Sequence, residues 1–176
     1  MPKRIEDLRE TILQNTKTIL LNQGCEKLTI RSVAAVCHVA VGTVYNYFPS
    51  KDILIASVMV EDWEDALEQM RVGCDGAQNC TEGMQCIFET IRSFSVTYSV
   101  TWERYRPQTS IPTYVQARHR QLLAQLSGVV KPLLERFVPD PVPHLARFVT
   151  EALLSGASDP DTAFAEMRPA LEKLIQ

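Results

Sequence analysis

The sequence of 176 residues predicts an all-α protein with eight or nine helices. Two observations favour this class. Apolar residues recur at intervals of three and four along most of the chain, which is the spacing of one face of an α-helix. No stretch of four to eight residues alternates between apolar and polar types as a half-buried strand does. The sequence also lacks an internal repeat, so we expect a set of distinct helices.

The first helix is predicted within "KRIEDLRETILQNTKTILLNQG", residues 3–24. Its apolar residues fall near one face at 3.6-residue spacing, and its charged residues fall on the opposite face. Gly24 marks the C-terminal end of this helix, because glycine readily adopts the left-handed backbone that follows many helices.

Two short helices are predicted next. The hydroxyl of Thr29 can cap a helix over "IRSVAAVC", residues 30–37. After a short turn, a second helix begins near Val41 and ends at Phe48. It ends there because Pro49 disfavours helical backbone at the residue before it.

Longer helices follow. Ser50 can cap the next helix, which is long. The stretch "GCDGAQNC", residues 73–80, is rich in small and polar residues and is predicted to be a loop. The helical pattern continues from Thr81, with a break around Pro107 and Pro112.

Proline also organises the C-terminal part of the chain. Pro132 predicts a kink within a helix. The last two helices are expected over residues 141–156 and 160–175. Asp140 caps the first of them, and Pro141 lies in its first turn.

Composition narrows the class of protein. No run of eighteen apolar residues exists, so no membrane span is expected, and the charged N-terminus lacks the apolar core of a signal peptide. We therefore expect a cytoplasmic protein. An odd number of cysteines fits reduced thiols better than a disulfide framework. The five are Cys25, Cys37, Cys74, Cys80 and Cys86.

Charge is distributed unevenly. The net charge of the whole chain is -3, yet residues 1–51 carry seven Lys or Arg against four Asp or Glu, a net charge of +3. The remainder carries -6. A basic N-terminal part on an acidic remainder is expected if only the N-terminal part meets a polyanion.

Two short helices joined by a three- or four-residue turn, between two longer helices, match the helix-turn-helix layout. Val33, Ala34, Cys37, Val44 and Phe48 are the apolar residues that this layout buries. Ala34 is small where the two helices must approach closely.

The stretch "LTIRSVAAVCHVAVGTVYNYFPSKDIL", residues 28–54, resembles the TetR/AcrR family of bacterial transcriptional regulators. One departure stands at Cys37–His38, where the family commonly has Ala or Ser followed by Gly. His38 can adopt the left-handed backbone that glycine would supply, at some cost. The matching residues are Thr29, Ile30, Ala34, Val39, Ala40, Gly42, Thr43, Val44, Tyr45, Tyr47, Phe48, Ser50, Lys51, Asp52 and Leu54.

The resemblance implies double-stranded DNA as a partner. Gly42 and Thr43, at the start of a helix, can offer backbone N–H groups and a hydroxyl to a phosphate. Tyr47 and Lys51 can contact the same DNA backbone, and the resemblance also places Tyr45 and Thr29 near it.

Base reading is expected from residues around this surface. The second short helix holds no Arg or Lys, so direct reading falls to Arg31 on the preceding helix and to Asn46, with apolar contact from Val41 to thymine methyl groups. Because these base contacts are few, DNA shape is expected to contribute to specificity.

The resemblance divides the chain into a DNA-binding domain, residues 1–51, and an effector-binding and dimerisation domain, residues 52–176. Aromatic residues of the second domain can line an apolar pocket for a small molecule of unidentified structure, although ordinary core packing is the alternative for each. The pocket candidates are Trp63, Phe88, Phe94, Tyr98, Trp102, Tyr105, Tyr114 and Arg118. Arg118 belongs to a basic group that could meet an anionic ligand.

The resemblance also implies a homodimer in which the last two helices pair with those of a partner. Two DNA-binding domains about one helical turn of DNA apart can read a palindrome. The interface candidates are Leu145, Phe148, Val149, Leu153, Phe164, Met167 and Leu171.

The function expected is a ligand-responsive transcriptional regulator, most often a repressor in this family. An enzyme is not expected, because the sequence has no nucleophile elbow, phosphate-binding loop or paired metal-binding histidines. No cofactor and no metal are expected. Cys74, Cys80 and Cys86 are spaced at six, and Cys80 and Cys86 would not share a helix face. A helical small-molecule-binding or thiol-sensing protein without DNA binding is the alternative.

Overall fold

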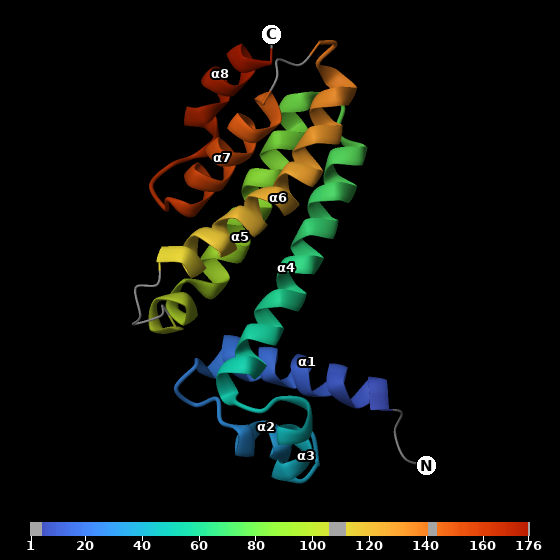
Figure 1. Cartoon of the computed structure of the whole chain (residues 1–176), viewed down its shortest axis with the longest axis vertical. Coiled ribbons are helices and arrows are strands. Elements are labelled where there is room, and N and C mark those ends of the chain that lie inside the picture. Colours follow the sequence, from blue (N-terminus) through green and yellow to red (C-terminus); the bar gives the residue numbers. More distant parts are fainter. Residues whose placement is uncertain (1–4, 106–111, 141–143, 176) are drawn as a thin grey trace. The chain divides into compact units, whose positions relative to one another are not determined.

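The structure is a computed structural model that describes residues 5–105, 112–140 and 144–175, with side chains described for residues 8–99, 120–140 and 144–175. Within these residues it contains eight helices and no strand (Figure 1), which confirms the all-α prediction. The helices are α1 (Ile5–Gln23), α2 (Ile30–Val36), α3 (Val41–Tyr47), α4 (Lys51–Gly76), α5 (Cys80–Tyr105), α6 (Pro112–Phe137), α7 (Leu145–Ser158) and α8 (Phe164–Leu174).

The chain forms two compact units that share the helix α4. The first, here called the head, contains α1, α2, α3, α4 as far as Trp63, and Val100–Arg104 of α5. The second, here called the body, starts at Glu64 within α4 and contains the rest of α5 with α6, α7 and α8. These units are defined by packing and not by function, so the functional division expected after residue 51 stays a prediction.

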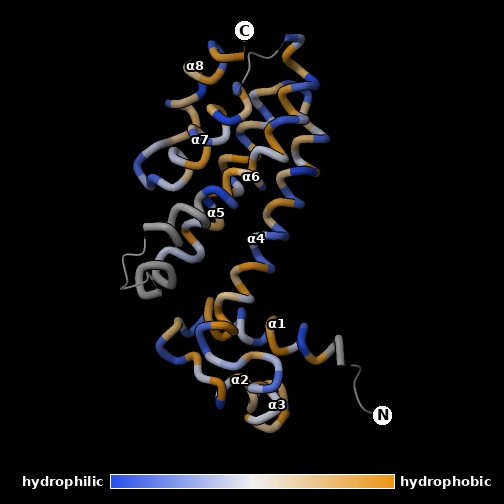
Figure 2. Tube along the Cα trace, viewed as in Figure 1, coloured by the Kyte–Doolittle hydropathy of each residue, from blue (hydrophilic) through white to orange (hydrophobic). Residues whose placement is uncertain are grey.

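The head is built on α1, α2 and α3, and its buried residues are apolar except for Thr16, whose hydroxyl donates to the Ile12 carbonyl at 2.6 Å. In Figure 2 hydrophobic and hydrophilic residues alternate along α1 and α4, as amphipathic helices require. Gly24 follows α1 with a φ of +79°, which confirms the predicted helix end. The most buried residues of the head include Ile12, Leu13, Leu28, Val33, Ala34, Val44, Phe48 and Leu54.

Both predicted caps in the head are confirmed. The Thr29 hydroxyl accepts a hydrogen bond from the Ser32 N–H at 3.0 Å, and the Ser32 hydroxyl accepts one from the Thr29 N–H at 2.9 Å. This capping box fixes the start of α2. The Ser50 hydroxyl likewise accepts from the Ile53 N–H at 3.1 Å and fixes the start of α4.

The body packs α5, α6, α7 and α8 around residues that are almost fully buried. At Gly156 of α7 other side chains pack close to the backbone, since an added Cβ would lie 2.2 Å from the Met167 Sδ atom and 3.3 Å from the Phe88 ring. The core residues include Met70, Met84, Ile87, Phe88, Ile91, Leu126, Val130, Leu133, Val149 and Leu153.

Arg92 of α5 joins this core to the connection between α7 and α8. Its guanidinium donates to the carbonyls of Gly156, Asp159 and Thr162, and it lies 4.8 Å from the centre of the Phe88 ring. Hydrogen bonds to a charged donor are stronger than neutral ones, so Arg92 holds the connection in place.

The predicted loop over residues 73–80 is wrong. α4 continues to Gly76 and α5 begins at Cys80, which leaves only residues 77–79 between them. Gly73 lies inside α4 because Cys86 packs against it: an added Cβ would be 2.1 Å from the Cys86 Sγ atom. Packing between the two helices therefore outweighs the weak helix propensity of glycine.

The starts predicted for the last two helices are also wrong. α7 begins at Leu145 after His144, so Asp140 does not cap it, and Pro141 lies outside the described residues. α8 begins at Phe164 rather than at residue 160. The Asp159 carboxylate instead accepts from the Thr162 hydroxyl and the Asp161 N–H. These two bonds lower the pKa of Asp159 and close a turn that delays the helix.

The predicted break between α5 and α6 falls partly outside the described residues. Pro112 is the first residue of α6, whereas Pro107 lies outside them. Among the helices that are described, none is both long enough and apolar enough to cross a bilayer.

Candidate functional site

The helix-turn-helix is closed by the turn between α2 and α3. His38 has a φ of +56°, which confirms the left-handed backbone expected where the family has glycine. Its N–H donates to the Ala35 carbonyl at 3.2 Å, and the Val39 N–H donates to the Ala34 carbonyl at 3.0 Å. Ala34 is 2% exposed, so a larger side chain there would not fit between the helices.

The outer surface of α3 carries the residues expected to meet DNA. Gly42, Tyr45 and Asn46 are exposed, whereas Val41 and Thr43 are half-buried. An added Cβ at Gly42 would meet nothing within 4 Å, so packing within the chain does not require glycine. A close approach by an external group remains a reason for glycine at this position.

Two expected phosphate contacts have further roles inside the head. The Thr43 N–H donates to the Ala40 carbonyl at 2.9 Å, which leaves the Thr43 hydroxyl as the group that can meet a phosphate. The Lys51 ammonium donates to the Cys25 carbonyl at 2.7 Å and is half-buried. An ammonium has three N–H donors, so this bond does not exhaust Lys51.

Around α3, the remaining candidates differ in exposure. Tyr47 is half-buried, and its ring centre lies 6.4 Å from that of Phe48. Thr29 and Arg31 are exposed at the start of α2. The Thr29 hydroxyl accepts a bond in its cap but keeps its own O–H as a donor.

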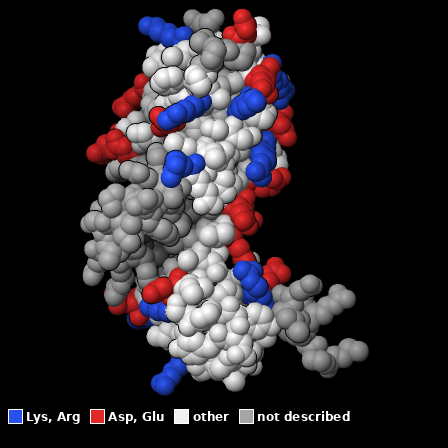
Figure 3. Space-filling view, in the orientation of Figure 1, with Lys and Arg blue, Asp and Glu red and all other residues white. Residues whose placement is uncertain are grey.

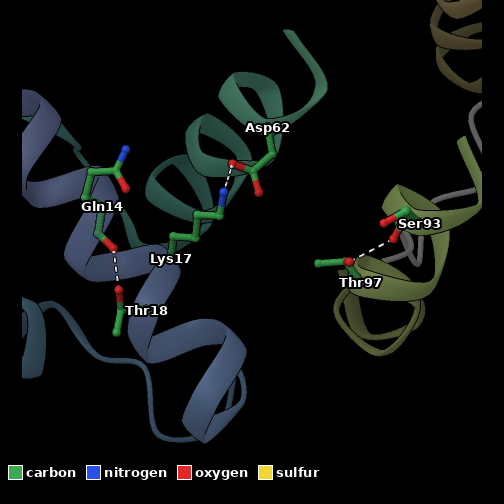
Figure 4. Close-up of polar contacts among 6 residues, drawn as sticks. All are labelled: Gln14, Lys17, Thr18, Asp62, Ser93 and Thr97. Carbon is green, nitrogen blue, oxygen red and sulfur yellow. Dashed lines mark hydrogen bonds and ion pairs between the residues drawn. The ribbon is translucent and has the colours of Figure 1, made fainter. Parts of the chain in front are cut away.

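Sequence reasoning missed the pairing of basic residues within the head. The Lys17 ammonium lies 2.6 Å from the Asp62 carboxylate (Figure 4), and the Arg9 guanidinium lies 2.9 Å from that of Glu61. The partners are more than forty residues apart in sequence, so no local pattern could reveal these pairs. Both pairs tie α1 to α4.

These pairs reduce the charge that the head can offer to DNA. Among the described side chains of the head, three basic residues have no carboxylate partner, and we call them the head cations: Lys27, Arg31 and Lys51. On the face of the head that Figure 3 shows, charged side chains are few and most of the surface is uncharged.

The pocket candidates are only partly tested. Phe88 is 1% exposed and packs on Phe164 at 5.5 Å between ring centres, so it belongs to the body core. Phe94 and Tyr98 stack at 5.0 Å, and Trp63 is buried in the head. The pocket stays a prediction. The side chains of Trp102, Tyr105, Tyr114 and Arg118 lie outside those that are described.

Most of the expected dimer-interface residues face the interior of the body. The residues buried within the subunit are Leu145, Val149, Leu153, Phe164 and Leu171. Met167 is half-buried beside Gly156. Phe148 is 66% exposed and is the member of the set that offers a large apolar surface to a partner.

The architecture of the head, a short buried helix followed by a short helix with exposed polar residues, defines a helix-turn-helix protein. Residues 12–58 match the family described as "Bacterial regulatory proteins, tetR family". Over residues 12–58, therefore, the chain carries the helix-turn-helix domain of the TetR family of bacterial regulatory proteins.

Relatives with curated functions match only part of the chain. The chain is 39% identical over 59 residues to the HTH-type transcriptional repressor KstR of Rhodococcus jostii, which covers 34% of this chain and 28% of that protein. It is 28% identical over 76 residues to the HTH-type transcriptional regulator UidR of Escherichia coli K12, which covers 43% of this chain and 39% of that protein. The matches thus span well under half of these relatives.

Fold similarity extends over the whole chain. A TetR-family transcriptional regulator from Pectobacterium atrosepticum matches with a TM-score of 0.69 at 18% identity, over 99% of this chain and 95% of that one. At this identity the match concerns the fold, and it includes the helices of the body.

Proposed function

We propose that this protein is a DNA-binding transcriptional regulator that binds a palindromic operator as a homodimer and responds to a small molecule. The observation that carries the proposal is the surface of α3, where Gly42, Tyr45 and Asn46 are exposed on a helix whose other side is buried through Val44. Packing alone does not explain these exposed residues, whereas contact with the DNA major groove does.

The contacts divide into two kinds. We assign the Thr43 hydroxyl, Tyr47, Lys51 and Thr29 to the DNA backbone, which fixes the position of the head on the duplex. We assign Arg31, Asn46 and Val41 to base edges, with Tyr45 beside the backbone. Repression is the more common mode in the family, and repressor is also the description of the relative KstR.

The proposed homodimer is supported by the exposure of Phe148 on α7. An aromatic residue that is 66% exposed on an otherwise well-packed helix is a reasonable anchor for a partner subunit. A small molecule bound in the body would act by changing the distance between two heads, which changes their fit to two half-sites.

Selection of bound fragments from the host genome, followed by fluorescence anisotropy on the enriched duplex, tests DNA binding. Thr43→Val removes the hydroxyl and keeps the shape, so it should weaken binding to all duplexes alike. Asn46→Ala should reduce discrimination between the selected and a scrambled duplex. Arg71→Ala, an exposed change in the body, is the control. Absence of salt-dependent binding to any duplex would contradict the proposal.

Sedimentation tests the dimer. Phe148→Asp should shift the protein from dimer to monomer at micromolar concentration, because a buried charge without a partner is costly. Val72→Asp is the matched control, since Val72 is also a strongly exposed apolar residue, on α4. Equal dimerisation of both variants and the unmodified protein would remove Phe148 from the interface.

A further inference from the structure

Three cysteine thiols come together where α4 meets α5. Cys74 lies near the C-terminal end of α4, and Cys80 and Cys86 lie in the first two turns of α5. All three belong to the body, and none forms a disulfide. Cys80 and Cys86 lie on different faces of α5 because six residues separate them. Cys86 faces α4, the helix that carries Cys74.

The contact between α4 and Cys86 is unusually close. An added Cβ at Gly73 would lie 2.1 Å from the Cys86 Sγ atom and 3.3 Å from its Cβ atom. Cys86 therefore rests against the backbone of the residue next to Cys74. The Cys74 thiol in turn points at α5, where its sulfur lies 3.8 Å from the Gly83 carbonyl oxygen. Gly83 is one helical turn before Cys86.

This geometry suits a covalent link. A disulfide requires Cα atoms about 4.4–6.8 Å apart and side chains that face each other. Gly73 allows the backbones of α4 and α5 to approach, and the two thiols reach across from opposite helices. Cys80 is also buried, and it contributes less than Cys86 to the raised pKa of Cys74.

We propose that Cys74 and Cys86 form a redox pair that closes an intramolecular disulfide on exposure to hydroperoxides. The Cys86 thiolate attacks the terminal peroxide oxygen, the O–O bond breaks, and Cys86 becomes a sulfenic acid while the hydroperoxide leaves as an alcohol, or as water in the case of hydrogen peroxide. The Cys74 sulfur then displaces the hydroxyl group from Cys86, which leaves as water after taking up the Cys74 proton.

Access and acidity set the order of these two steps. Cys86 is half-buried, whereas Cys74 is 6% exposed, so Cys86 meets the oxidant first. Burial, with smaller contributions from Cys86, Asp75 and Cys80, raises the pKa of Cys74 to about 12. Cys74 thus stays a thiol at neutral pH, so it does not react with the peroxide itself, and it must give up its proton to the departing hydroxyl group as it attacks the Cys86 sulfur.

Peptide mapping tests the pair without any use of DNA, so its outcome is independent of the proposed function. The reduced protein is treated with hydrogen peroxide, its remaining thiols are blocked under denaturing conditions, and it is digested without reductant. Trypsin alone leaves all three cysteines in one peptide, residues 72–92. Adding proteases that cut after Glu82 and before Asp75 separates residues 72–74, 75–82 and 83–89, with one cysteine in each.

The expected product is the 72–74 peptide linked to the 83–89 peptide, at a mass two hydrogens below their sum. Cys86→Ser should abolish the product, and Cys74→Ser should leave Cys86 as a sulfenic acid that dimedone traps. Cys25→Ser is the control that should keep the link, because Cys25 lies in the head.

Three results would overturn the proposal. These are a link between the 75–82 and 83–89 peptides, oxidation of Cys86 to sulfinic acid with no link in the unmodified protein, or unreacted thiols after excess peroxide. Circular dichroism of each serine variant confirms that it is folded. If a serine variant unfolds, the alanine variant at the same position takes its place.

Discussion

Arg31 offers the sharpest test of the proposed DNA contacts. It is exposed at the second residue of α2, and it makes no ion pair within the described part of the chain. Replacing it with alanine removes the guanidinium without disturbing the capping box formed by Thr29 and Ser32. We expect Arg31→Ala to fold normally and to lose sequence discrimination, because arginine is the residue that most often reads guanine.

The magnitude follows from the two-fold symmetry of the proposed complex. One good bidentate contact contributes about 1–3 kcal/mol of discrimination, so two half-sites lose about 2–6 kcal/mol. At about 1.4 kcal/mol for each tenfold change, the affinity for the operator falls by about 30-fold to about 20,000-fold. The affinity for a scrambled duplex falls much less, since that complex depends on phosphate contacts.

The assay is fluorescence anisotropy with the selected duplex and its scrambled counterpart, at matched salt concentration. Arg71→Ala is the control, because Arg71 is exposed on α4 in the body and pairs with Glu68. Equal proportional losses on both duplexes would show that Arg31 contacts phosphate rather than bases. No loss on either duplex would refute the assigned position of α2 on DNA.

Four further outcomes are expected. Lys27 and Lys51, the head cations not assigned to bases, give four per dimer, so the logarithm of the binding constant should fall with the logarithm of the salt concentration with a slope of about -4, and a slope near zero would contradict the interface. Thr29→Ala should lower the free energy of unfolding by about 1 kcal/mol in urea titrations, whereas Thr29→Ser should not. His38→Gly should be neutral or stabilising by up to about 1 kcal/mol and His38→Val destabilising, because φ is +56°. The free energy of unfolding should be constant below about pH 9 and should fall as the pH rises towards 12, because Cys74 ionises at a lower pH in the unfolded chain than in the folded one. Urea titrations at several pH values should show a smaller fall for Cys74→Ala.

The head could be predicted from the sequence because its determinants are local. Thr29, Gly24 and Ser50 act on backbone groups within a few residues, and the buried positions of α2 and α3 follow the periodicity of two short helices. Even the backbone of His38 followed from the position that glycine usually occupies. Each of these features is decided by neighbours in the chain.

The body was less predictable because distant packing decides its boundaries. Gly73 and Gly76 suggested a loop, but contact with Cys86 keeps the segment helical. The last helix was expected from residue 160, but the Asp159 carboxylate closes a turn there and the helix begins at Phe164. The approach of Cys74 to α5 was missed for a similar reason. It depends on how two helices pack, and the spacing of cysteines along one helix carries no information about that packing.

The charge that the head offers to a partner could not be predicted from the sequence of the head alone. A count of residues gives the N-terminal part +3, but Asp62 and Glu61 of α4 neutralise Lys17 and Arg9. The Asp62 side chain is only 13% exposed, so DNA phosphates would compete poorly for Lys17. With fewer cations, we expect non-specific attraction to DNA to be weak, so that hydrogen bonds from α3 supply a larger share of the proposed affinity. This balance favours a regulator that discriminates strongly between its operator and other sequences, because charge contacts bind all sequences alike.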